Sequence, residues 1–131
     1  MNDREELSCF KSSSQLMAGV LVAISIPIFT SQLEKAREAT DLANIRSAYA
    51  ECSTAVLTNT NGENGVTFTA AAGTTPASAS KDVKLTQKQA DWQTADAATN
   101  EIAGKKINTL PNSGTVTVTV KGDGTWTCET K

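Results

Sequence analysis

The side chains in this sequence that could take part in chemistry are few and scattered. There are three cysteines, Cys9, Cys52 and Cys128, and no histidine. The absence of histidine removes Ser-His-Asp triads, Cys-His nucleophiles and histidine-bearing metal sites. The sequence also contains no CxxC pair, phosphate-binding glycine loop or dinucleotide fingerprint. We therefore expect neither an enzyme nor a cofactor or metal site.

Two of the cysteines are placed where folding could bring them together. Cys52 lies on the apolar stripe of an expected helix, and Cys128 lies on the apolar face of an expected C-terminal strand. If that strand crosses under the helix, a disulfide would close a loop of about 76 residues and contribute about 3–4 kcal/mol. An exported protein would permit such a bond. The alternative is a pair of small buried thiols, and both interpretations stay open.

A long helix, expected over residues 16–57, is the element that must position these side chains. Its first part, residues 16–29 (LMAGVLVAISIPIF), is almost wholly apolar, whereas residues 30–57 are amphipathic and charged. At about 1.5 Å per residue this helix is roughly 60 Å long, which exceeds the width of a small domain. Pro27 lacks a backbone donor and crowds the preceding turn, so we expect a kink there. The alternative is that the helix begins at Pro27.

The amphipathic half of the helix has one apolar face, because apolar residues recur at steps of three and four. They are Leu42, Ile45, Tyr49, Cys52 and Val56. Polar residues, including Lys35, Glu38 and Arg46, are assigned to the opposite face. Glu34 and Glu38 are spaced to pair with Arg37 and Asp41 at i,i+3 and i,i+4 along the helix. We expect these charges to form a solvated face; the alternative is pairing between subunits where helices crowd together.

The region after the helix begins with a turn near Asn59, because the asparagines and glycines of residues 59–65 accept positive φ. Residues 66–69 alternate in polarity and form either a first strand or a loop anchor. The small residues 70–80 (AAAGTTPASAS) predict a surface loop. Residues 81–85 predict a short strand.

A short helix is expected next, because Thr86 and Gln89 have the spacing of a capping box. It would run through Trp92. We expect Trp92 to bury against the sheet, and a ligand-stacking role is the less favoured alternative. Residues 96–104 give no clear pattern.

The clearest β signal is a C-terminal hairpin over residues 115–130, where threonine alternates with apolar residues. A three-residue loop at 122–124 pairs Val120 with Trp126 and keeps the apolar residues on one face. A two-residue loop would mix the two faces, so we predict the three-residue loop. The residues that the hairpin contributes to the helix–sheet core are Val116, Val118, Val120 and Trp126.

These elements predict an α+β fold in which one long helix packs on a small antiparallel sheet of three or four strands. Residues 58–80 would connect the helix to a β-rich region over residues 81–131. The chain of 131 residues suffices for one domain with a modest core. Its net charge of −2 gives no clear footprint for nucleic acid.

The first segment, residues 1–15 (MNDREELSCFKSSSQ), does not match an export signal, because it has mixed charge and no apolar core. The apolar run that follows, residues 16–29, is shorter than the roughly 20 residues needed to span a bilayer. The sequence as written therefore predicts neither a standard signal nor a full transmembrane helix.

The runs LVAISIPIFTSQLEKAR at residues 21–37 and DLANIRSAY at residues 41–49 closely resemble the N-terminal helix of type IV pilins and pseudopilins. The likeness is greatest to the pilins of Gram-positive bacteria and covers about Val20 to Glu51. Members of this family carry a glycine–aromatic cleavage site upstream. At the family's spacing those two positions hold Glu5 and Glu6, so the cleavage motif is not matched.

The resemblance implies a type IV pilin-like fold and a structural subunit of a cell-surface filament. Self-association into a helical filament, the pilus assembly machinery and membrane contact before assembly are the implied partners. Pro27 would mark the helix kink. The residues assigned to filament assembly are Val20, Leu21, Val22, Ala23, Ile24, Ile26, Ile28 and Phe29.

Other functions remain as alternatives. Within the same family, the chain could be a pseudopilin of a secretion or DNA-uptake apparatus. From other classes, it could be a soluble surface-binding module or a defective gene product that is not exported.

Overall fold

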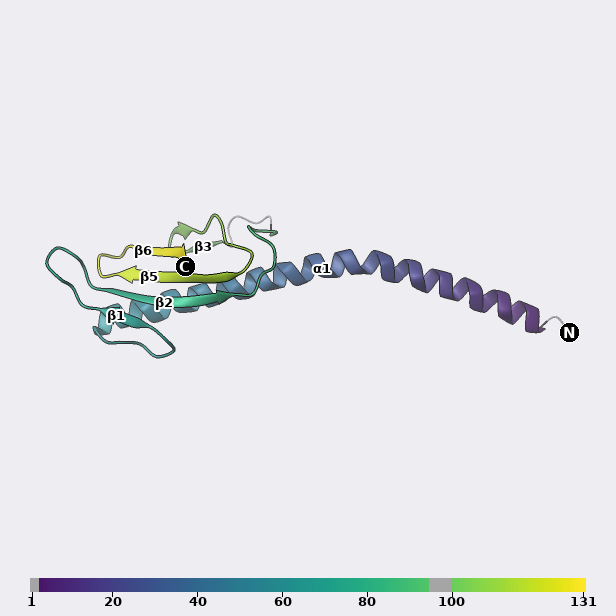
Figure 1. The fold of residues 1–131 in the computed structure, drawn as a ribbon, viewed down its shortest axis with the longest axis horizontal. Coiled ribbons are helices and arrows are strands. Elements are labelled where there is room, and N and C mark those ends of the chain that lie inside the picture. The colour runs from purple at the N-terminus through teal and green to yellow at the C-terminus, as the bar shows by residue number, and fades with distance from the viewer. Residues whose placement is uncertain (1–2, 95–99) are drawn as a thin grey trace. The chain divides into compact units, whose positions relative to one another are not determined.

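The fold combines one helix with antiparallel sheets (Figure 1). A computed structural model describes the backbone of residues 3–94 and 100–131, and the side chains of residues 29–94 and 100–131. The chain divides into two compact units, Met1–Leu33 and Glu34–Lys131. The described part of the first unit is helical, and the second unit holds the sheets and the hydrophobic core.

Helix α1 spans Asp3–Thr58. It therefore begins before residue 16, where the apolar run predicted its start, and the alternative start at Pro27 is wrong because Pro27 lies inside the helix. The kink at Pro27 stays a prediction. The predicted end is confirmed: Asn59, the first residue after the helix, has a φ of 54°, and the backbone N–H of Thr60 donates to the carbonyl of Ala55 at 3.3 Å.

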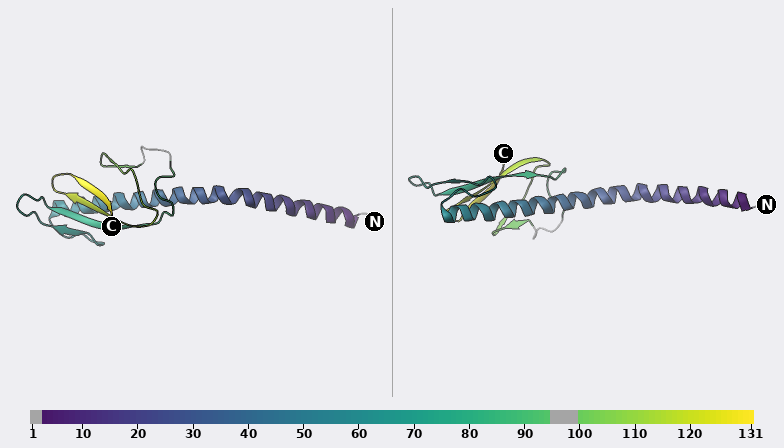
Figure 2. Two further views of the ribbon diagram at one scale, coloured as in Figure 1. Left: turned by 45° about the horizontal axis from the view of Figure 1, so that its top comes forward. Right: turned by 90° about the horizontal axis from the view of Figure 1, so that it is seen from below.

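The main sheet has four antiparallel strands in the order β1-β2-β5-β6, which confirms the predicted α+β class. The strands are β1 (Thr67–Thr69), β2 (Ser78–Leu85), β5 (Gly114–Lys121) and β6 (Trp126–Thr130). Figure 2 shows this sheet beside the C-terminal part of α1. A second sheet, which the sequence pattern did not predict, pairs β3 (Glu101–Ile102) with β4 (Lys105–Lys106).

The core lies between α1 and the main sheet, where one face of each element is apolar. All the residues predicted for the helix–sheet core belong to it. Leu42, Ile45, Cys52, Val116, Val118, Val120 and Trp126 are buried, and Tyr49 and Val56 are half-buried against them. Tyr49 also meets Trp126 edge-on, with ring centroids 5.3 Å apart. The alternation along β5 therefore places its valines on the helix and its threonines on the outer face.

The C-terminal hairpin has the predicted register. Val120 pairs with Trp126 and Val118 pairs with Cys128, which leaves a three-residue loop. Gly124 in that loop has a φ of +86°, and its backbone N–H donates to the carbonyl of Lys121 at 3.1 Å. Positive φ at this position is the requirement of a type I turn followed by a bulge.

Two predictions for the middle of the chain are wrong. The loop predicted over residues 70–80 ends earlier, because β2 begins at Ser78 and Ala79 is buried between β1 and β5. Pairing on both sides overrides the weak strand propensity of these small residues. The helix expected from Thr86 through Trp92 is absent from this described stretch, which is irregular.

Candidate functional site

Three carboxylates on α1 lie buried on the same face as the core residues. Their exposed fractions are 3% for Glu34, 1% for Glu38 and 0% for Asp41. The steps of four and three between them continue to Ile45, so one helix face changes from acidic to apolar along its length. The prediction that these carboxylates form a solvated face, with Glu38 opposite the core, is therefore wrong. We call these three residues the carboxylate row.

Asp41 binds the beginning of the irregular stretch. Its Oδ1 accepts hydrogen bonds from the backbone N–H and the hydroxyl of Thr86 at 2.9 and 2.8 Å. Its Oδ2 accepts one from the backbone N–H of Gln87 at 2.9 Å. Gln87 is itself buried, and its side-chain amide donates to the carbonyl of Pro111 at 2.9 Å. Asp41 thus ties the end of β2 to the helix.

Glu34 and Glu38 bind the rest of the stretch in the same way. The Oε1 of Glu34 accepts the backbone N–H groups of Lys88 and Gln89. Glu38 accepts the backbone N–H groups of Gln93 and Thr94, and the hydroxyl of Thr94 donates to its Oε2 at 2.7 Å. Carboxylate oxygens thus replace the partners that a helix or sheet would have supplied. We call residues 86–94 the anchored segment.

The electrostatics of Glu34 reflect this arrangement. Burial alone would raise the pKa of its carboxyl group. The backbone donors of Gln89 and Lys88 outweigh that effect, and with the help of Arg37 they hold the pKa below its ordinary value of 4.5. The pair between Arg37 and Glu34, at 3.2 Å, is one of the predicted i,i+3 contacts.

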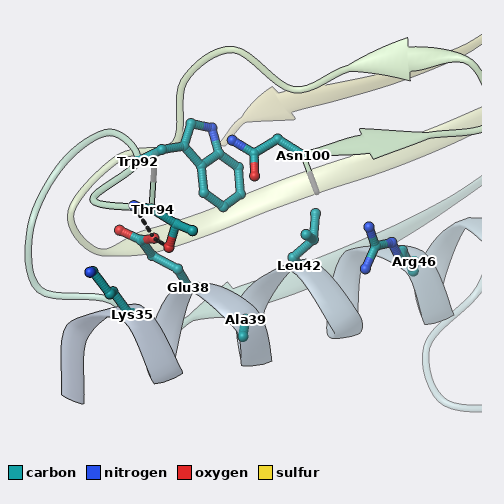
Figure 3. Close-up of a pocket in the computed structure, with 8 residues that line it drawn as sticks. All are labelled: Lys35, Glu38, Ala39, Leu42, Arg46, Trp92, Thr94 and Asn100. Atoms are coloured by element: carbon teal, nitrogen blue, oxygen red, sulfur yellow. Dashed lines mark hydrogen bonds between the residues drawn. The ribbon is translucent and has the colours of Figure 1, made fainter. Parts of the chain in front are cut away.

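The anchored segment places Trp92 over the helix. The indole Nε1 donates to the carbonyl of Ile107 at 2.8 Å, which fixes the orientation of the ring. Trp92 is half-buried and packs against the hydrophobic core, whereas its burial against the sheet itself stays a prediction. The ring also forms one wall of a pocket of about 330 Å³. Figure 3 shows Trp92 and Asn100 facing Leu42 of α1 across this space.

The pocket is lined mainly by α1 and the anchored segment. Its lining residues are Lys35, Glu38, Ala39, Leu42, Arg46, Trp92, Thr94 and Asn100. All of them belong to the unit Glu34–Lys131. The acceptors of Glu38 are occupied by the anchored segment, so the pocket offers an apolar floor with basic side chains at its edge.

The two described cysteines are free thiols, so the suggested Cys52–Cys128 bridge is not formed in this structure. The Sγ of Cys52 lies 3.8 Å from the carbonyl of Val118 instead, and Cys128 pairs with Val118 from the neighbouring strand. Burial raises the pKa of Cys52 to about 11 and also raises the pKa of Cys128. Both thiols are therefore poor nucleophiles.

Most of the residues predicted for filament assembly have side chains outside the described part of the structure. They are Val20, Leu21, Val22, Ala23, Ile24, Ile26 and Ile28, together with Pro27 at the predicted kink. Phe29 is described and is 70% exposed, and Leu33 after it is 40% exposed. Large apolar side chains this accessible to water are candidates for contact with a partner.

Sequence reasoning missed the carboxylate row, although a signal was present. Asp41 adjoins the core residue Leu42, and Glu38 and Glu34 continue the three-and-four spacing upstream. A charged residue at a core position of the helical repeat is consistent with a buried carboxylate whose oxygens accept hydrogen bonds, as well as with a solvent-exposed helix face.

Comparisons with known proteins leave the family of this chain open. No protein-family model, no curated protein and no solved structure matches it. Within residues 3–94 and 100–131, no helix combines the length and apolar character needed to cross a membrane. The described side chains also contain no cluster of three or more metal-binding groups.

Proposed function

We propose that this chain is a structural subunit of a type IV pilus or pilus-like surface filament. The observation that carries the proposal is the difference between two parts of α1. Residues 34–56 of the helix supply one side of a folded core, whereas residues 16–33 contain no charged residue. An uncharged helical stretch ending in exposed Phe29 and Leu33 is suited to burial against other subunits.

The antiparallel sheet supports the same proposal. Its inner face packs on the helix, while the threonines of β5 lie on the other face and remain partly exposed. A subunit with an apolar helical stretch and a polar sheet surface can bury the first in a fibre and expose the second. The resemblance of residues 21–37 and 41–49 to pilin helices adds to this argument.

The test is to shear the surface of the native cells and to map the released protein by peptide mass spectrometry. The proposal expects peptides from Glu34 onward in a fibre fraction. Detection of an intact Met1 form in the cytosol alone would contradict it. If the protein stays with the cell envelope and is scarce, a pseudopilin of a secretion or DNA-uptake apparatus fits better.

One observation favours a second candidate, a soluble surface-binding module. The unit Glu34–Lys131 contains every core residue among the described side chains, together with the Trp92 pocket, so a ligand could bind this unit alone. That function predicts a stable monomer which still binds its ligand after deletion of residues 1–29. A filament subunit would lose assembly on the same deletion.

A further inference from the structure

The loop that joins α1 to β1 contains two asparagine–glycine pairs, Asn61-Gly62 and Asn64-Gly65. An asparagine that precedes glycine can lose its side-chain amide, because the next backbone nitrogen attacks the Cγ of the carboxamide. Glycine has no Cβ to hinder that approach. Both asparagines are exposed to water, so the two pairs differ in how the fold holds them and not in their access to solvent.

The fold restrains both members of the first pair. The side-chain Oδ1 of Asn61 accepts the backbone N–H of Phe68 at 2.8 Å, which fixes the carboxamide. Gly62 packs on a buried side chain, since a Cβ built at Gly62 would lie only 2.9 Å from the Cβ of Val66. The rotation that brings the carboxamide of Asn61 onto the nitrogen of Gly62 therefore breaks a hydrogen bond and shifts a packed residue.

The second pair lies at the centre of a turn that is held less firmly. Asn64 has a φ of 56° and Gly65 a φ of 83°, the two positive values that define a type I′ turn. The turn is closed by the N–H of Val66, which donates to the carbonyl of Glu63 at 3.3 Å, longer than an ordinary bond of this kind. Among the residues that the structure describes, none forms a hydrogen bond with the side chain of Asn64. A Cβ at Gly65 would meet nothing within 4 Å, so the turn can open without displacing a packed neighbour.

We propose that Asn64 is a site of spontaneous deamidation and that the fold protects Asn61. In the opened turn the backbone nitrogen of Gly65 bonds to the Cγ of Asn64, its proton passes to the leaving amide, and ammonia departs. The resulting succinimide adds one water molecule and opens to aspartate or isoaspartate, according to which carbonyl the water attacks. Glu51 and Glu63 line the same pocket as Asn64, so either product raises the negative charge of that pocket.

The experiment incubates the purified full-length chain in heavy-oxygen water at mildly alkaline pH, which favours loss of the proton from the attacking nitrogen. The chain is then digested in ordinary water, and tandem mass spectrometry assigns the heavy oxygen to Asn61 or to Asn64. Only conversion during the incubation carries the label. Asn64 should convert at least about tenfold faster than Asn61, the factor that corresponds to one hydrogen bond of about 1.4 kcal/mol.

The matched control is the same chain in denaturant, where both pairs lose the contacts that distinguish them and their rates should become similar. The variant Asn64→Gln must close a larger ring, so the label at residue 64 should disappear while the rate at Asn61 stays unchanged. Equal rates in the folded chain, faster conversion of Asn61, or no label at Asn64 overturns the proposal. A difference that persists in denaturant also overturns it, because the local sequence and not the fold would then be the cause.

Discussion

Removal of the Asp41 carboxylate should destabilise the folded unit more than removal of any exposed acid. In Asp41→Ala the buried N–H of Gln87 loses its acceptor, which costs about 1–3 kcal/mol. Thr86 is exposed and water can satisfy its donors, so its two bonds add at most about 1 kcal/mol. The sum is about 1–4 kcal/mol, and in a domain of this size it lowers Tm by at least about 4 °C.

The assay is denaturant unfolding of the full-length chain, followed by tryptophan fluorescence and circular dichroism. Asp41→Asn is the isosteric companion, because it keeps the shape but points an amide donor at backbone N–H groups; it should also destabilise. Asp82→Ala is the matched control, since Asp82 is exposed and its side-chain partners among the described residues are Thr117 and Lys131. If the free energy of unfolding of Asp41→Ala differs from that of the wild type by less than about 1 kcal/mol, the lower end of the expected range, the anchoring role is refuted.

Three further predictions concern acid, backbone strain and thiol reactivity. The pKa of Glu34 in the folded state lies below 4.5, so the hydrogen bonds to its carboxylate stabilise the fold above pH 4.5 and are lost as the pH falls through that lowered pKa. The amide resonance of Lys88, whose N–H donates to Glu34, should report this transition. Gly124→Ala should lower the free energy of unfolding by about 1–2 kcal/mol, because residue 124 has a φ of +86°. Gly122→Ala should lower it less, because φ there is not positive and a Cβ would lie 3.5 Å from the nearest atom. Cys52 is buried with a pKa of about 11, so at pH 8 it should react with a thiol reagent only at the rate of unfolding; rapid labelling of the native protein would contradict this.

The parts of the fold that could be predicted from the sequence are those whose pattern is local. Threonine–valine alternation in β5 left one register that keeps Val120 and Trp126 on the same face, and the structure has that register. The three-and-four spacing through Ile45 identified the core face of the helix for the same reason. In both cases the residue pattern of a single element indicates which of its faces is buried.

The parts that could not be predicted depend on contacts between distant segments. Thr86 and Gln89 have the spacing of a capping box, but the N–H groups of Thr86 and Gln87 donate to Asp41, and that of Gln89 donates to Glu34. A capping box describes one way to satisfy such donors, and a carboxylate from a distant helix is another. The early start of β2 at Ser78 likewise depends on pairing with both neighbours.

The change of character along α1 follows from what each part of the helix faces. The strands beside Ile45 and Cys52 satisfy their own backbone groups in the sheet, so the helix can meet them with apolar side chains. The anchored segment has no such ladder, and against an apolar face the N–H groups of residues 86–89, 93 and 94 would lose the carboxylate acceptors that they have here. A carboxylate can accept several donors at once, which repays the cost of burying its charge. The carboxylate row is therefore the means by which an irregular segment, and with it Trp92, is held on the helix.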